Sequence, residues 1–178
     1  MTCITEHQVR QMLGRSKTLY KKMRWSCKLN QTRNIWWSFE SPILIDDQLV
    51  EGLVCRCQWR APTGFSGMNA ALMLLWEQKR VFAWCIDSTK RHRNHKSGAD
   101  REYYGQLICG NHEHVWCEAR DSDDNQQDSY AKPIEGTYDL FCDAWQAFAR
   151  QANIQNVTCV PPDEARQAGQ SDFLDHNL

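Results

Sequence analysis

Within residues 50–60, side chains alternate from Leu53 onward between an apolar set and a mostly polar set, and this alternation constrains the fold more than any other feature of the chain. Successive side chains of a β-strand point to opposite faces of its sheet, so the segment predicts a strand with one buried face and one polar face. The predicted buried face carries Leu53, Cys55, Cys57 and Trp59, and the polar face carries Val54, Arg56, Gln58 and Arg60.

Other segments with the composition of strands lie on both sides of this one, at residues 35–45, 70–77, 81–87, 103–108 and 112–118. The connections between them are too short for the crossovers that join parallel strands, so we expect antiparallel pairing. Asp46 and Asp47 predict a turn after the first of these strands. The sequence therefore predicts an α+β fold, with a mostly antiparallel sheet of about five strands flanked by an N-terminal and a C-terminal helix.

The N-terminal helix has a clear start signal. Thr5 and Gln8 have the spacing of a capping box, and Ile4 and Val9 occupy the positions of a hydrophobic staple. Apolar side chains then recur at helical spacing as far as Met23. We therefore expect a helix that packs by this apolar stripe and exposes a basic face.

The C-terminal helix is expected after Thr137, which is a suitable cap. Its strongly apolar stripe predicts that it covers one face of the sheet, and Asn153 is a suitable stop. Proline residues then end regular structure. We expect a single α+β domain over residues 1–160 and a mobile C-terminal tail over residues 161–178.

The chain has nine cysteines and a formal net charge of −1. The N-terminus lacks the apolar segment of a signal peptide, and no apolar run is long enough to cross a membrane. We therefore expect a cytoplasmic location, no membrane partner, and thiols that are mostly buried and reduced. Cys109 and Cys117 lie near several histidines and leave a zinc site open, although their spacing matches no standard zinc finger.

Four of the six histidines fall within residues 80–118. On a strand, His112 and His114 project to one side, together with Trp116 and Glu118. Antiparallel pairing with the preceding strand would bring Asp87 close to them. The loop between the two strands supplies the other two histidines, His92 and His95.

Two chemistries fit this group. Two imidazoles, a carboxylate and nearby cations form a general acid–base set for phosphodiester cleavage, and the cations in the loop are Lys90, Arg91, Arg93 and Lys96. Alternatively, His112 and His114 point the same way from one strand and suit a divalent metal. A third interpretation is that the histidines are structural and have no chemical role.

Three short motifs carry a resemblance to known proteins. They are Ile86-Asp87, His92-Arg93-Asn94 and Gly110-Asn111-His112-Glu113-His114, followed by a helix that ends near Asn153-Ile154. This succession resembles a family of small prokaryotic proteins and is similar to the TumE-type toxins of bacterial toxin–antitoxin pairs. The resemblance implies a gene of a mobile element or defence locus whose product acts on RNA.

The leading hypothesis is a small prokaryotic or phage protein that is a metal-independent ribonuclease of toxin type, without a cofactor. Its partner would be RNA or a protein encoded nearby. One alternative is a non-enzymatic interaction protein, either an inhibitor of a host defence complex or an antitoxin-like partner, and another is a histidine-based metalloprotein. The predicted catalytic residues are Asp87, His92, His95, His112 and His114, and the predicted binding residues are Lys90, Arg91, Arg93, Asn94, Trp116 and Glu118.

Overall fold

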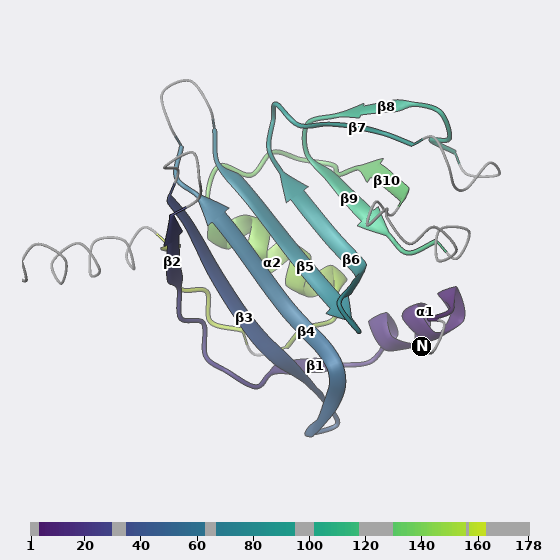
Figure 1. Ribbon diagram of the computed structural model, residues 1–178, viewed down its shortest axis with the longest axis vertical. Coiled ribbons are helices and arrows are strands. Elements are labelled where there is room, and N and C mark those ends of the chain that lie inside the picture. Colours follow the sequence, from purple (N-terminus) through teal and green to yellow (C-terminus); the bar gives the residue numbers. More distant parts are fainter. Residues whose placement is uncertain are drawn as a thin grey trace, which may run out of the picture.

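The computed structural model describes residues 4–29, 35–62, 67–94, 102–117, 130–155 and 157–162. Within them the chain forms a large antiparallel sheet, a small two-stranded sheet and two helices (Figure 1). The predicted α+β class, with a mostly antiparallel sheet and a helix near each end of the chain, is confirmed. The predicted sites at His95 and Glu118, and the predicted tail beyond residue 162, lie outside the described residues.

The large sheet has eight strands, and neighbours in the sheet are mostly neighbours in the chain. Its order is β1 (Lys17–Leu19), β3 (Ile35–Ile45), β4 (Gln48–Arg60), β5 (Asn69–Trp76), β6 (Lys79–Ile86), β9 (His112–Val115) and β10 (Tyr130–Pro133), and β2 (Ser26–Leu29) pairs with the other end of β3. The small sheet pairs β7 (Arg91–Arg93) with β8 (Leu107–Cys109), and the helices are α1 (Glu6–Gly14) and α2 (Phe141–Gln151).

The large sheet gains three strands that the sequence did not predict, namely β1, β2 and β10. Each has only three or four residues, so no alternation is long enough to be recognised. The long strands were predicted correctly because each is long enough for the two-residue alternation of its side chains to repeat several times. The alternation of β4 is clear in its burial, since Cys55 and Cys57 are fully buried while Gln58 is exposed.

Tight turns join the longest strands and fix their register. Asp46 and Asp47 both have positive φ, 50° and 61°, between β3 and β4. Glu77 and Gln78 repeat this geometry between β5 and β6, with φ of 49° and 64°. Two successive residues of positive φ match the twist of a two-residue hairpin. The turn predicted at Asp46-Asp47 is confirmed.

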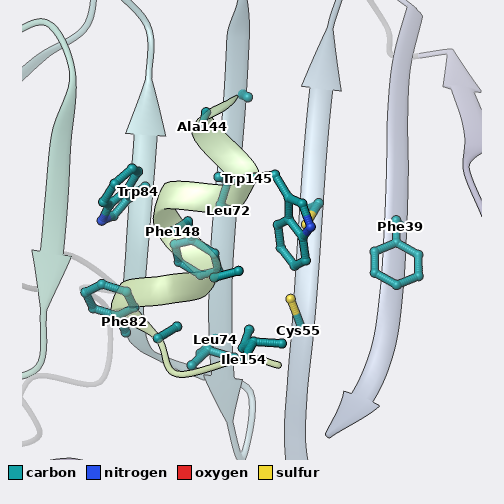
Figure 2. Packing of buried hydrophobic residues seen from close by; sticks show 14 of the residues in the cluster. Phe39, Cys55, Leu72, Leu74, Phe82, Trp84, Ala144, Trp145, Phe148 and Ile154 are labelled. Carbon is teal, nitrogen blue, oxygen red and sulfur yellow. The ribbon is translucent and has the colours of Figure 1, made fainter. Parts of the chain in front are cut away.

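The hydrophobic core lies between α2 and one face of the large sheet (Figure 2). Trp145 and Phe148 of α2 are fully buried, and the ring of Phe148 stacks on Phe82 of β6 with centroids 5.4 Å apart. Leu72 and Leu74 of β5 lie beneath the helix. Burial of a large apolar side chain contributes about 1.5–3 kcal/mol, so this interface dominates the stability of the domain.

Helix α1 begins as predicted but is shorter. The capping box is present, because the backbone N–H of Gln8 donates to Thr5 Oγ1 at 3.2 Å and that of Thr5 donates to Gln8 Oε1 at 2.8 Å. The predicted continuation to Met23 is wrong, since the helix ends at Gly14. Pairing with β3 overrides the helical pattern, and the chain enters β1 at Lys17.

The buried ammonium group of Lys17 joins the ends of both helices. Lys17 is fully buried, and its Nζ donates to the carbonyl oxygens of Leu13, Arg15 and Ala152 at 3.0, 2.7 and 2.8 Å. The carbonyls of a helix C-terminus carry partial negative charge, which suits a cation. Burial, with a smaller effect of Arg15, lowers the pKa of Lys17 to about 8.

Helix α2 follows Leu140, which makes no side-chain capping hydrogen bond, so the prediction of Thr137 as its cap is wrong. The apolar contacts of the helix with the sheet decide where it starts. Its end agrees with the prediction, because Asn153 has a left-handed φ of 53°. A disulfide joins Cys142 of α2 to Cys159, which corrects the expectation of reduced thiols for this pair.

Among the described residues, neither helix has the length and apolar character needed to cross a membrane.

Candidate functional site

The paired strands β6 and β9 bring two histidines and a cysteine together. In their antiparallel register, Cys85 lies opposite His112 and Ala83 lies opposite His114. The alternate pairs, Trp84 with Glu113 and Phe82 with Val115, face the other side of the sheet. Phe82 and Trp84 lie beside α2 in Figure 2, so Cys85, His112 and His114 project from the face away from that helix.

The small sheet contributes a third histidine. His92 of β7 pairs with Ile108 of β8, and both side chains point inward, because Ile108 is buried while its neighbours Leu107 and Cys109 are exposed. The ring centroid of His92 lies 5.0 Å from that of His114 and 5.7 Å from that of His112. We call Cys85, His92, His112 and His114 the histidine cluster.

The donor atoms of this cluster are closely spaced. Cys85 Sγ lies 3.5 Å from His114 Nε2, and one ligand atom from each of Cys85, His112 and His114 lies within 4.8 Å of the others. The rings of His112 and His114 are 4.8 Å apart between centroids. All three side chains are buried, and His92 is half-buried. Thiolate and imidazole together form a ligand set typical of zinc.

The Nε2 atom of His112 is available to bind a ligand. It is fully buried, and its Nδ1 lies 2.7 Å from the carbonyl oxygen of Gly110, to which it donates. Its Nε2 is buried and has no hydrogen-bond partner among the described residues. Burial lowers the pKa of His112, the Gly110 carbonyl opposes this, and Lys90 and Arg80 lower it further. The ring is therefore neutral near pH 7, with a lone pair on Nε2.

Asn94 holds the small sheet against the large one. Its side chain, 2% exposed, donates from Nδ2 to the carbonyl oxygens of Ala131 and Tyr103 at 2.7 and 3.1 Å. Its Oδ1 accepts from the backbone N–H of Ala131 at 2.9 Å. Ala131 of β10 pairs with His114, so Asn94 fixes the hairpin one strand away from the histidines. Its side chain is thus fully engaged within the protein.

Asp87 does not hydrogen-bond to an imidazole in the described residues. One carboxylate oxygen accepts from Asn69 Nδ2 at 2.6 Å, and the other accepts from the N–H and the hydroxyl of Thr89 at 2.9 and 2.7 Å. These contacts stabilise the turn that leads from β6 to β7. Asp87 acts on His112 only through its charge, which raises the pKa of that ring against the larger effect of burial.

The two predicted arginines do not converge on the histidines, whereas the charge of Lys90 acts on His112. Arg91 and Arg93 flank His92 on β7, so they project from the opposite side of the strand, and both are exposed. Lys90 is also exposed, immediately before β7. Three of the predicted imidazoles, those of His92, His112 and His114, lie together, and the two arginines face solvent, while His95 and Lys96 lie outside the described residues.

Trp116 lies apart from the cluster. β9 ends at Val115, so the alternation does not carry the following side chain onto the same face as the histidines. The indole Nε1 of Trp116 donates to the carbonyl oxygen of Ile4 at 3.2 Å. Trp116 and Val9 both line a cavity of about 240 Å³ beside α1. Trp116 therefore contacts the N-terminal segment and not the histidine cluster.

Cys85 is the site residue that the sequence did not indicate. Cys109 and Cys117 were closer to the histidines in the chain, but Cys109 is exposed. A signal was present, because the alternation of residues 81–87 puts Cys85 on the same face as Asp87. Following the antiparallel register two residues back from Asp87 places Cys85 opposite His112.

Comparison with protein-family models, with curated proteins and with solved structures gives no match to this chain. The functional assignment therefore depends on the chemistry of the histidine cluster and of the molecular surface.

Proposed function

We propose that this chain is a metalloprotein that binds a zinc ion in the histidine cluster. Cys85, His112 and His114 are the ligands, and His92 is the fourth donor. The observation that carries the proposal is the juxtaposition of one thiol and two imidazoles, buried, with donor atoms within 4.8 Å of one another.

The spacing of the donors fits zinc. Zn–S and Zn–N bonds of about 2.3 and 2.0–2.1 Å place tetrahedral ligands roughly 3.3–3.6 Å apart. The distance of 3.5 Å between Cys85 Sγ and His114 Nε2 already falls in this range. The widest separation, 4.8 Å, needs a closure of about 1 Å, which side-chain rotation supplies.

The surroundings of His112 support the same proposal. A histidine that binds a metal through one nitrogen commonly donates its other N–H to a carbonyl, which fixes the tautomer and the ring orientation. The hydrogen bond from Nδ1 to Gly110 has this form and leaves Nε2 as the donor. A ligand must be deprotonated, and the lowered pKa of His112 keeps it neutral.

The bound ion would join two sheets. Cys85, His112 and His114 belong to the large sheet, whereas His92 belongs to the small one. A site with four protein ligands is typical of structural zinc, which contributes to folding. The ion would therefore stabilise the position of the β7–β8 hairpin.

The toxin-type ribonuclease stays a prediction, and so does the interaction protein of a mobile-element or defence locus. Acid–base cleavage needs imidazoles that reach the substrate and cations beside the phosphate. The burial of His112 and His114 and the outward direction of Arg91 and Arg93 favour the metal instead. Incubation of metal-free protein with RNA tests the ribonuclease, since cleavage that a His112→Ala/His114→Ala variant lacks would favour it.

Metal binding is tested on the full chain, purified under reducing conditions and stripped of metal. Titration with Zn²⁺ against a chromophoric chelator should give one ion per chain. Titration with Co²⁺ should give the d–d absorption of a tetrahedral site and a thiolate-to-cobalt charge-transfer band. A Cys85→Ser variant should lose the charge-transfer band, while a Cys109→Ser variant, which changes an exposed cysteine, should keep it.

The proposal fails if the wild type binds no Co²⁺, or if its spectrum contains no thiolate band. It also fails if the His112→Ala/His114→Ala variant, shown to be folded by circular dichroism, retains the wild-type affinity.

A further inference from the structure

The face of the large sheet opposite α2 is divided into two parts. Over β9 and β10 it is covered by the β7–β8 hairpin, which Asn94 fastens to Ala131. Over β3, β4 and β5 no helix of the described residues covers it, and α2 lies behind these strands in Figure 1. We call this second part the open face, and it is independent of the proposed metal site.

The side chains of the open face are polar, cationic and aromatic on β3 and on the end of β4, whereas β5 adds the apolar Ala71 and Met73. Trp36 and Ser38 of β3 alternate with the buried Trp37 and Phe39, so they point away from the core. On β4, Gln58 and Arg60 alternate in the same way with Cys57 and Trp59.

Arg60 and Trp36 form a cation–π pair on this face. The guanidinium carbon of Arg60 lies 5.4 Å from the centroid of the Trp36 ring. The Nε atom of Arg60 is buried and has no hydrogen-bond partner among the described residues, while the side chain as a whole is half-buried. A guanidinium in a cation–π contact retains its charge for an anion, and the pair supplies planar groups on which a base can stack.

A basic cavity adjoins the open face at the edge of β3. It measures about 340 Å³ and is lined by Lys21, Lys22 and Arg24, together with Phe39 and Glu40. All three cations are exposed. Glu40 is the one carboxylate in this lining, and it pairs with Arg56 Nε at 2.6 Å, so each charge offsets the other. The edge therefore has an excess of positive charge.

We infer that the open face and this basic edge bind single-stranded nucleic acid. Single strands present bases that stack on aromatic rings or guanidinium planes, and a phosphate backbone that follows a groove of cations. The Arg60–Trp36 pair would accept a base, and Lys21, Lys22 and Arg24 would contact phosphates. Charge complementarity favours this ligand over an acidic protein, which supplies no stacking bases.

The test is fluorescence anisotropy of a labelled single-stranded RNA with the full chain, over a range of salt concentrations. If the three cations contact phosphates, the logarithm of the affinity should fall with the logarithm of the salt concentration with a slope of about −2.1. A fourfold rise in salt should therefore weaken binding by about 18-fold. A Lys21→Gln/Arg24→Gln variant should reduce the slope to about −0.7.

An Arg60→Gln variant should weaken binding by about tenfold through loss of the stacking plane. The matched control is Arg10→Gln/Arg15→Gln, which removes the same charge from exposed arginines on α1 and at its end, and should leave affinity and slope almost unchanged. The inference is overturned if low salt gives no binding, or if the control weakens binding as much as Lys21→Gln/Arg24→Gln. Equal affinity for duplex RNA or for polyglutamate would also overturn it.

Discussion

Replacing Asn94 with alanine should loosen the β7–β8 hairpin. The substitution removes three hydrogen bonds, of 2.7, 2.9 and 3.1 Å, and each neutral bond contributes about 1 kcal/mol. It also leaves the N–H and the C=O of the fully buried Ala131 without these partners, and an unsatisfied buried group costs about 1–3 kcal/mol. With partial relaxation, we expect a loss of about 3–4 kcal/mol in the free energy of unfolding.

The same variant should weaken zinc binding, because the hairpin carries His92. Urea denaturation followed by circular dichroism measures the stability, and chelator competition measures the affinity. A Gln106→Ala variant, which changes an exposed residue of the same connection, is the control and should be neutral within about 0.5 kcal/mol. A loss below about 1 kcal/mol for Asn94→Ala would refute the view that this side chain fastens the hairpin. Undiminished zinc affinity in the destabilised variant would exclude His92 as a ligand.

Two further predictions concern stability away from the site. The Cys142–Cys159 disulfide spans 17 residues, so its reduction should lower the free energy of unfolding by about 3 kcal/mol, and urea denaturation with and without reductant, in the presence of a metal chelator, measures this. A Cys142→Ser/Cys159→Ser variant should show no effect of reductant, and an equal effect there would contradict the assignment. Between pH 8 and the ordinary pKa of lysine, unfolded chains bind a proton at Lys17 that folded chains have lost, so the contribution of Lys17 to stability should rise with pH in this interval, opposed by the raised pKa of Cys57. A Lys17→Met variant should lose this rise while being less stable near pH 7, and the same rise in both proteins would refute it.

The parts of the fold that were predictable are those where a local pattern repeats. β4 alternates in burial from Leu53 to Arg60, and the capping box at Thr5 is a local device, so neighbouring residues determine both. The short strands β1 and β10 depend on partners that are distant in the chain, and no local signal reveals them. The end of α1 at Gly14 has the same cause, since pairing with β3 competes with continued helix.

The sequence predicted the shared face of the histidines of the candidate site, but it did not predict the direction of the arginine side chains. His112 and His114 share a face because they are two residues apart on a strand, which is a local fact. Cys85 required the register between β6 and β9. The position of Arg91 and Arg93 required β7, a strand of three residues within a segment expected to be a loop. A loop allows many directions for these side chains, whereas the strand allows only one.

The contacts of Lys17 have a consequence for the order of events during synthesis. Its backbone N–H donates to the carbonyl oxygen of Asn153, and its own carbonyl oxygen accepts from the N–H of Gln155. Both of these backbone partners, and Ala152 among the three carbonyls that bind the ammonium group, thus belong to a segment that leaves the ribosome more than a hundred residues later. Until then Lys17 has only the local carbonyls of Leu13 and Arg15. The domain must therefore complete its folding after translation has passed the second helix.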